Sequence, residues 1–342
     1  MKTLIIGPSW VGDMLMSQSL YRHLKEQNPQ RCIDVLAPDW CRPVLERMPE
    51  VNSAIAMPVG HGSLQWEVRK RIGSELHEHN YEQALVLPNS LKSALIPWFA
   101  KIPLRTGWRG EMRYGLLNDL RKLDKQAYPL MVQRYVALSQ PKGTPALPLE
   151  TILPPSLRVD SQAQQKAIDE FKLSQTGAIA FCPGAEFGPA KRWPDYHYAQ
   201  LARHLIADGH TIWLFGSQKD DPICQQIINQ LSPAEQANCH NLAGRTSLPQ
   251  AIDLIAACQV AISNDSGLMH IAAAVNTPLI ALYGPTSPGF TPPLSERASI
   301  IRLIEGFHKI RKGDADQGYH QSMIDITPEM AFAETQKWLD KR

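Results

Sequence analysis

The sequence has 342 residues, of which 44% are hydrophobic, so it can form two domains of ordinary size with a core in each. Its formal net charge of +2 excludes a nucleic-acid binder that relies on overall charge. The six cysteines are scattered without a C-x-x-C pair, which favours reduced thiols in the core over a disulfide framework or a zinc site. No stretch approaches the roughly 18 apolar residues of a membrane span.

Short apolar segments alternate with helical patterns in the first half of the sequence. Strands are predicted at 3–6, 33–37, 54–57 and 84–87. Helices are predicted near 14–26, 40–47, 64–77 and 90–100. Alternation of this kind is typical of an α/β fold in which helices cover a parallel sheet.

A proline-rich segment, residues 139–160, follows this first half. Its prolines are Pro141, Pro145, Pro148, Pro154 and Pro155. Because proline lacks a backbone donor and fixes φ, the segment is predicted to be a linker. We therefore expect one domain over residues 1–150 and a second over residues 151–326.

The alternation starts again in the second half. Strands are predicted at 178–182, 211–215, 260–263 and 278–283, and helices at 196–208, 248–257 and 267–275. Thr327, Pro328 and Glu329 are typical of a helix start, and this helix is predicted to reach Leu339. Two Rossmann-like domains facing a central cleft are expected, with segment 327–342 packing back on the first domain.

The loop after the first predicted strand, GPSWVGDMLMSQSL at 7–20, has the glycine spacing of a phosphate-binding loop. A phosphate-binding loop would have lysine at position 13, followed by serine or threonine, but this chain has Asp13 and Met14. The residue types leave two roles open for Asp13. It can cap a helix that starts near Met14, or it can take a proton from a reacting hydroxyl.

Three loops after strands of the second half carry glycine and small polar residues. In SNDSGLMHIAAA (263–274) the helix start offers free N–H groups to a phosphate, unless Asp265 and Ser266 merely cap the helix. In CPGAEFGPAKRWP (182–194) Lys191 can neutralise a diphosphate, unless the loop is simply solvated. FGSQKDD (215–221) repeats the pattern of strand, glycine and small residue.

The segment from Lys101 to Lys125 is locally basic, with seven Lys or Arg against three Asp or Glu, a net of +4. Two aromatic residues, Trp108 and Tyr114, interleave with its arginines. Such arginines can bind phosphates or carboxylates bidentately. A solvated loop and a nucleic-acid patch are the other interpretations, and the latter has no recognised fold to support it.

Four segments together resemble the ADP-heptose:LPS heptosyltransferase II family over essentially the full length. They are GPSWVGDMLMSQSLYRHL, CPGAEFGPAKRWP, SNDSGLMHIAAA and LYGPTSPGFTPP. The resemblance implies a GT-B glycosyltransferase whose second domain binds the ADP-sugar and whose first domain faces the acceptor. It also implies that no cofactor and no metal are needed in the donor site.

The resemblance further implies an inverting transfer of heptose from ADP-L-glycero-β-D-manno-heptose. The acceptor would be the 3-hydroxyl of the first inner-core heptose, carried on Kdo-lipid A. Asp13 would act as the base. Lys191 and the N–H groups at 266–268 would offset the charge that develops on the leaving ADP.

The resulting predicted site has a donor half and an acceptor half, and its catalytic residues are Asp13 and Lys191. The donor-binding residues are Gly184, Lys191, Gly216, Ser217, Asp265, Ser266, Gly267, Leu268 and His270. The acceptor-binding residues are Gly12, Asp13, Arg105, Arg109 and Arg113. Segment 308–322, with Lys309, Arg311 and Lys312, could serve either half.

The acceptor carries Kdo carboxylates and lipid A phosphates, so an anionic membrane surface is an expected partner and nucleic acid is not. The expected location is cytoplasmic, peripheral at the inner face of the inner membrane of a Gram-negative bacterium.

Two alternatives to this function are a family member with a different core acceptor and a nucleotide-sugar epimerase of the same fold. A dehydrogenase is disfavoured because Ser9 stands at the second glycine of G-x-G-x-x-G. Three loops suited to a diphosphate disfavour a non-catalytic lipid-binding module.

Overall fold

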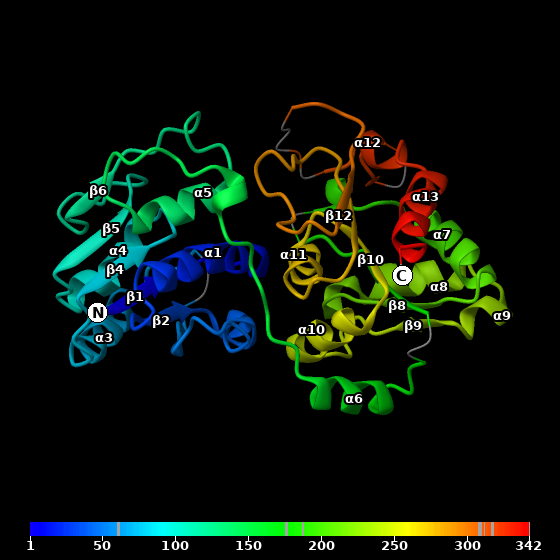
Figure 1. The fold of residues 1–342 in the computed structure, drawn as a ribbon, viewed down its shortest axis with the longest axis horizontal. Coiled ribbons are helices and arrows are strands. Elements are labelled where there is room, and N and C mark those ends of the chain that lie inside the picture. Colours follow the sequence, from blue (N-terminus) through cyan, green and yellow to red (C-terminus); the bar gives the residue numbers. More distant parts are fainter. Residues whose placement is uncertain are drawn as a thin grey trace. The chain divides into compact units, whose positions relative to one another are not determined.

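The computed structural model describes residues 1–59, 62–174, 177–186, 188–306, 310, 312–315 and 318–341. The chain divides into two compact units, Met1–Leu157 and Arg158–Arg342 (Figure 1). The prolines of segment 139–160 precede this division. Each unit is built around one parallel sheet, which confirms the predicted α/β class with two Rossmann-like sheets.

The sheet of the first unit has six parallel strands. They are β1 (Lys2–Ile6), β2 (Cys32–Ala37), β3 (Ser53–Ala56), β4 (Gln83–Val86), β5 (Leu104–Trp108) and β6 (Asp119–Arg121). Their order in the sheet is β3-β2-β1-β4-β5-β6. The winding direction reverses between β1 and β4, where doubly wound sheets bind ligands at the carboxyl ends of the strands.

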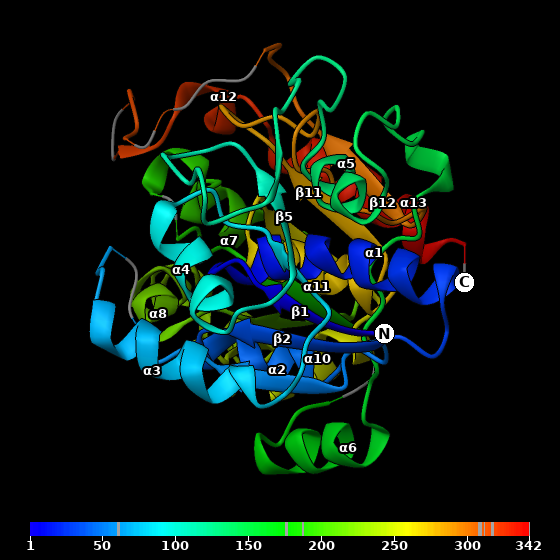
Figure 2. The ribbon, with the colours of Figure 1, turned by 90° about the vertical axis from the view of Figure 1, so that its left-hand side faces the viewer.

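Helices cover both faces of this sheet (Figure 2). They are α1 (Val11–Gln27), α2 (Arg42–Leu45), α3 (Trp66–His77), α4 (Leu91–Phe99) and α5 (Met131–Val136), with 3-10 turns at Asp39–Cys41, Ala137–Ser139 and Leu149–Thr151. α1 packs against α5, and α3 packs against α4. A Cβ atom on Gly73 would lie 2.4 Å from the Cβ of Phe99, so glycine is what lets α3 approach α4 so closely.

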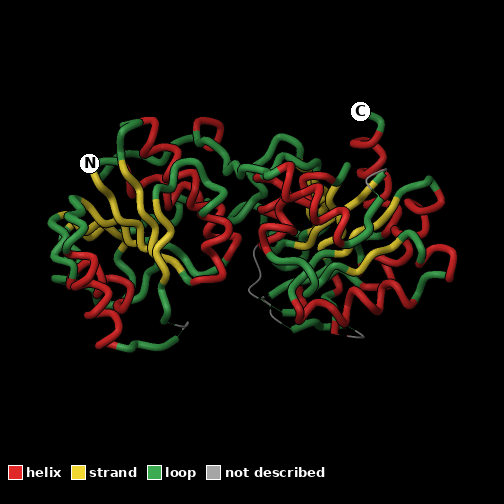
Figure 3. The backbone as a smooth tube through the Cα atoms, turned by 90° about the horizontal axis from the view of Figure 1, so that it is seen from below, coloured by secondary structure: helices red, strands yellow, loops and turns green. Residues whose placement is uncertain are grey.

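The second sheet repeats the topology of the first. In Figure 3 the strands of each sheet lie among helices. Its strands are β7 (Ala178–Cys182), β8 (Thr211–Leu214), β9 (Cys239–Asn241), β10 (Val260–Asn264), β11 (Leu279–Leu282) and β12 (Ala298–Ile301). Their order is β12-β11-β10-β7-β8-β9, so the reversal lies between β7 and β10.

The helices of the second unit are α6 (Ser161–Glu170), α7 (Asp195–Ala207), α8 (Asp221–Asn229), α9 (Pro233–Gln236), α10 (Leu248–Ala257), α11 (Gly267–Ala274), α12 (Gln321–Ile324) and α13 (Pro328–Leu339), with 3-10 turns at Pro189–Lys191 and Gln218–Asp220. α13 begins where it was predicted, because the Thr327 side chain accepts from the amide of Met330. The helix packs on α7 and on β10 to β12, and Phe332, Trp338 and Leu339 complete the apolar core there. It therefore packs within the second unit. The expected contact of segment 327–342 with the first domain stays a prediction.

Five of the six cysteines are buried, as predicted for core residues, and Cys32 is half-buried. Within the described part of the chain, no helix is both long and apolar enough to cross a membrane.

Candidate active site

A pocket opens in the first unit where the winding of its sheet reverses. It has a volume of about 240 Å³. Its lining comes from the loops after β1, β4 and β6, from the last residue of β5 and from α1 and α5. It comprises Pro8, Ser9, Trp10, Asp13, Leu87, Pro88, Asn89, Trp108, Leu123, Met131, Arg134 and Tyr135. The carboxyl ends of parallel strands thus converge on one cavity that contains the predicted base, Asp13.

Asp13 lies inside α1 and not ahead of it, since the helix begins at Val11 and Asp13 is its third residue. Gly12, predicted to contact the acceptor, precedes it in the same first turn. A carboxylate in the first turn interacts favourably with the positive end of the helix dipole, so this position both stabilises the helix and holds the side chain in place. Gly7 permits the tight entry, because a Cβ there would meet Met14 Cε at 2.8 Å.

Asp13 acts electrostatically on two neighbouring groups. Burial raises the pKa of Tyr135 well above its usual value, and the charge of Asp13 adds to that effect. Burial likewise raises the pKa of the Cys41 thiol to about 12, again with a contribution from Asp13. Both groups are therefore neutral near pH 7. The carboxylate of Asp13 is the anionic group of a wall that is otherwise largely apolar and aromatic.

Arg134 is the cation of this pocket. Its Nε donates to the Tyr128 carbonyl at 2.8 Å and its Nη2 donates to the Pro129 carbonyl at 3.2 Å. These bonds to the backbone hold the guanidinium at the pocket wall, where it can face an anionic group of a ligand. Neither Arg134 nor Tyr135 was predicted from the sequence.

The basic segment of the first unit is not a continuous charged surface. Arg113 is fully buried, and Arg105 is half-buried with its Nε on the Leu116 carbonyl and its Nη1 on the Ile102 carbonyl. The interpretation of an exposed basic patch is thus wrong for Arg113, because its guanidinium donates hydrogen bonds to oxygens inside the protein. Arg109 is exposed.

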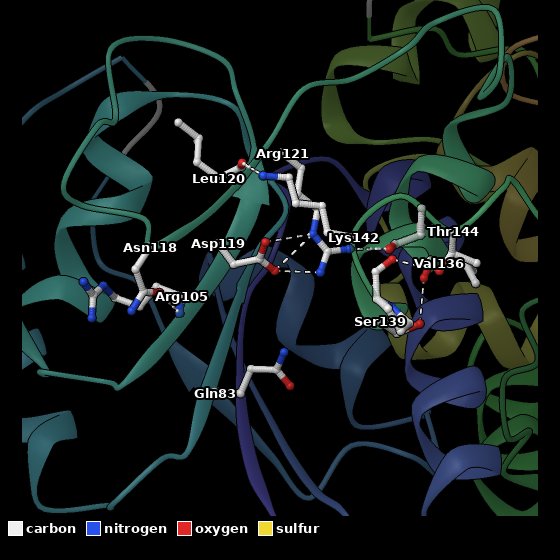
Figure 4. Close-up of polar contacts among 12 residues, drawn as sticks. Gln83, Arg105, Asn118, Asp119, Leu120, Arg121, Val136, Ser139, Lys142 and Thr144 are labelled. Atoms are coloured by element: carbon white, nitrogen blue, oxygen red, sulfur yellow. Dashed lines mark hydrogen bonds and ion pairs between the residues drawn. The ribbon is translucent and has the colours of Figure 1, made fainter.

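Further contacts hold the strands of this segment in place (Figure 4). Asp119 pairs with Arg121 at 2.6 Å. Arg105 also donates its backbone N–H to Asn118 Oδ1 at 2.8 Å. These contacts make the segment a structural part of the sheet edge, and of its seven cations Lys101, Arg109, Lys122 and Lys125 are exposed.

In the second unit, Lys191 and Asp265 meet across the reversal of the sheet. Lys191 ends the 3-10 turn in the loop after β7, and Asp265 directly follows β10. Lys191 Nζ lies 2.6 Å from Asp265 Oδ2, and both side chains are largely buried. Two of the predicted donor residues are thereby brought together, from loops 74 positions apart.

His270 and Tyr283 complete this cluster. Burial lowers the pKa of His270 to about 4; the positive charge of Lys191 also lowers it, and Asp265 opposes the shift. Burial raises the pKa of Tyr283 well above its usual value, and Asp265 adds to this. His270 is therefore a neutral hydrogen-bond donor or acceptor near pH 7. Tyr283, in the segment LYGPTSPGFTPP, lies close enough for the charge of Asp265 to affect its pKa.

The start of α11 lies beside this cluster. Ser266 is its N-cap residue, and Gly267 and Leu268 are its first two residues. The amide groups of a first helical turn have no partner within the helix, so they can bind an anion. Asn264 positions the turn, since its Nδ2 donates to the Pro183 carbonyl at 2.7 Å and its Oδ1 accepts from the Trp193 amide at 3.1 Å.

Gly184 and Gly216 enclose the carboxylate of Asp220. A Cβ on Gly184 would lie 2.6 Å from Asp220 Cγ, and one on Gly216 would lie 2.6 Å from Asp220 Cβ. Ser217 donates both its amide and its hydroxyl to Asp220 Oδ2, at 2.9 and 2.7 Å. The two predicted glycines and Ser217, from the loops after β7 and β8, thus surround an acid that was not predicted.

Of the segment 308–322, Lys309 and Arg311 lie outside the described residues, and Lys312 is exposed. The described residues contain no group of three or more His, Cys, Asp or Glu side chains that could hold a metal ion.

Comparison with known proteins identifies relatives of this chain. The model of glycosyltransferase family 9 (heptosyltransferase) matches residues 69–320. Lipopolysaccharide heptosyltransferase 2 of Escherichia coli K12 is 60% identical over 98% of this chain and 97% of its own length. Lipooligosaccharide heptosyltransferase 2 of Haemophilus influenzae is 58% identical, with full coverage of both chains. The solved structure of E. coli ADP-heptose lps heptosyltransferase II superposes with a TM-score of 0.90 at 56% identity, covering 100% of this chain and 99% of that one.

The chain belongs to glycosyltransferase family 9. The family resemblance predicted from the four sequence segments is confirmed, and with it the expected enzyme class. Within this family 9 chain, sequence reasoning missed Arg134, Tyr135 and Asp220. Asp220 had a local signal, since it lies in the third glycine loop, FGSQKDD. Arg134 and Tyr135 had none, because α5 is short and no helix was predicted there.

Proposed function

We propose that the chain transfers heptose from ADP-heptose to the first heptose of the lipopolysaccharide inner core. It is a heptosyltransferase of inner-core synthesis, and its relatives of 58 to 60% identity carry the type 2 name. The observation that carries the assignment is the division of charged groups between the two sheets. Asp13 lies in a pocket at the reversal of the first sheet, and Lys191 and Asp265 lie beside a helix start at the reversal of the second.

The chemistry starts from the acceptor. Its 3-hydroxyl enters the pocket of the first unit, and its oxygen attacks the anomeric carbon of the donor heptose from the face opposite to ADP. As the new C–O bond forms, the hydroxyl proton passes to the carboxylate of Asp13. Attack from the opposite face inverts the anomeric configuration.

The bond that breaks joins the anomeric carbon to the β-phosphate oxygen. ADP leaves with its electron pair, and the ammonium group of Lys191 and the amides at 266–268 stabilise the developing charge. Asp265, being anionic, is better suited to heptose hydroxyls than to phosphate. The neutral imidazole of His270 can donate a hydrogen bond without adding a charge.

The acceptor is an amphiphile, so the enzyme works at the cytoplasmic face of the inner membrane as a peripheral protein. Arg134 faces the pocket and suits a Kdo carboxylate. Arg109 is exposed and suits the anionic surface.

A single-turnover assay with ADP-heptose tests the proposal. Three acceptors are compared, namely Kdo-lipid A with no heptose, with one and with two. Transfer only to the acceptor with one heptose, with a new linkage at its 3-hydroxyl by NMR, is the expected result. Preferred transfer to either other acceptor would assign the chain to a different step. Interconversion of the ADP-sugar without acceptor would indicate an epimerase.

A further inference from the structure

The loop that joins β5 to β6 exposes two large apolar side chains at its tip. Met112 is 79% exposed and Tyr114 is 66% exposed, among the highest values for large apolar residues in the described chain. We call residues 109–115 the rim loop. Single exposed apolar residues are common on proteins, whereas two at the tip of one loop are typical of an interaction site when the loop is held in place.

Arg113, which lies between these two residues, fastens the rim loop to the body of the unit. Its side chain is 0% exposed. Its guanidinium donates to oxygens of Pro88, Asn89, Ser90, Ser93 and Trp108. Burying a guanidinium is costly, and this burial is offset by hydrogen bonds to several acceptors at once. The turn that presents Met112 and Tyr114 is thus built into the fold.

Two further contacts bring the rim loop against the start of α4. The Glu111 carboxylate accepts the amide of Leu91 at 2.7 Å. Gly110 lies so close to Asn89 that a Cβ would stand 2.2 Å from the Asn89 carbonyl oxygen. The loop is therefore held on both sides of Met112.

The same anchoring residues line the pocket of Asp13. Pro88, Asn89 and Trp108 each bond to Arg113 and each belong to the pocket wall. The tip of the rim loop consequently lies at the edge of the proposed acceptor site.

Cations accompany the two apolar side chains. Arg109 is exposed at the start of the rim loop, and its amide donates to the Arg121 carbonyl at 2.5 Å. Lys122 is the next residue on that strand end and is also exposed. Apolar and aromatic tips flanked by Arg or Lys are the composition that binds an anionic membrane interface.

We propose that the rim loop is a membrane-contact element. Met112 and Tyr114 enter the interface of the bilayer that carries the lipid-linked acceptor, while Arg109 and Lys122 meet anionic head groups. This inference rests on the proposed function, since it takes the acceptor to be anchored in a bilayer. It moves the membrane contact away from Arg105 and Arg113, whose guanidinium groups are occupied within the protein.

Vesicle binding of the full chain tests the inference directly. The variant is Met112→Ser/Tyr114→Ser, and the vesicles contain phosphatidylethanolamine with or without phosphatidylglycerol. Loss of two apolar contacts should weaken binding to phosphatidylglycerol vesicles by roughly tenfold. Met330→Ser is the matched control, because Met330 is an exposed methionine on α13, and it should bind as the parent does. Equal melting temperatures establish that both variants are folded.

Kinetics with two forms of the acceptor separate this inference from the proposed function. For the double variant, KM for the lipid-linked acceptor in vesicles should rise roughly tenfold, and KM for the same acceptor after removal of its acyl chains should not change. Parental vesicle binding in the folded double variant would overturn the inference. An equal loss with the deacylated acceptor would also overturn it, since the loop would then contact sugar. If the parent transfers no heptose to either form of the acceptor, the proposed function fails, and the vesicle-binding result alone tests the rim loop.

Discussion

The first unit joins β1 to α1 through residues 7–10, whereas the second joins β7 to α7 through residues 183–194. The strand order is the same in both, so this difference in loop length decides which charge stands where the sheet reverses. The short connection places a carboxylate, Asp13, in the first turn of its helix. The long connection lets Lys191 reach the end of a different strand and pair with Asp265. One scaffold thus supports proton removal in one unit and charge neutralisation in the other.

The largest effect is expected from Asp13→Asn, which keeps the shape of the side chain and removes its basicity. Positioned bases contribute about a hundred- to ten-thousand-fold, so single-turnover transfer should fall by that factor while ADP binding to the second unit stays unchanged. Asp39→Asn serves as the control, because Asp39 is an exposed acid of the same unit. Transfer at the parental rate by a folded Asp13→Asn variant would show that Asp13 is not the base.

A pH-dependent loss of stability is expected in the second unit, from His270. Its pKa is about 4 in the folded chain, below the ordinary 6.5, because burial disfavours the charged ring. Unfolding therefore takes up a proton below pH 6.5, so the stabilisation is complete above that pH and is lost as pH falls from 6.5 to about 4. The loss amounts to about 3 kcal/mol. Melting temperatures of the parent and of His270→Gln between these pH values measure it. Parallel curves for the two would contradict the assignment.

Lys191→Ala should weaken the binding of ADP, measured by calorimetry, by roughly ten- to a hundredfold, the range of a charge-assisted hydrogen bond. The same variant should bind the acceptor as the parent does when no donor is present. It therefore changes the donor half of the site alone, whereas Asp13→Asn changes the acceptor half. Lys219→Ala is the matched control, since Lys219 is 77% exposed and pairs with Glu186 at 3.1 Å. The donor role of Lys191 would be refuted by equal ADP affinities for the two lysine variants.

The smallest effect is expected from Arg109→Gln. One basic group near an anionic surface contributes roughly 1 kcal/mol, so KM for the lipid-linked acceptor should rise about fivefold at low salt and approach the parental value at high salt. Arg71→Gln removes another exposed arginine, from α3, and should change neither value. A rise in KM that persists at high salt would point to a direct contact with the acceptor.

Strands and helices with a strong apolar pattern were predictable from the sequence. β7 and α10 were predicted with the bounds that the structure has, and α13 starts at its capping threonine. β5, β6, β9 and β12 were missed. β6 and β9 have only three residues each, and β5 carries an arginine and a glycine, so neighbouring strands and not local periodicity define them.

The candidate site was predictable where a loop directly follows a strand. Lys191 and Asp265 are such residues, and the order of the strands brings them together. Asp13 lies one step further on, in the first turn of the helix that follows such a loop. The burial of Arg113 could not be predicted, because its acceptors include the Pro88 carbonyl, 25 residues earlier in the chain. A charged side chain looks solvent-exposed in a sequence until the oxygens around it are known.

The turn around Asp220 has a consequence for mutational tolerance. Alanine at Gly184 would collide with the carboxyl group of Asp220, whereas alanine at Gly216 would collide with its Cβ. Asp220→Ala removes the first obstacle and keeps the second, so it should rescue Gly184→Ala but not Gly216→Ala. Epistasis at this turn is therefore directional. A library of alanine substitutions would accept the pair 184/220 and reject the pair 216/220, although the two glycines border the same side chain.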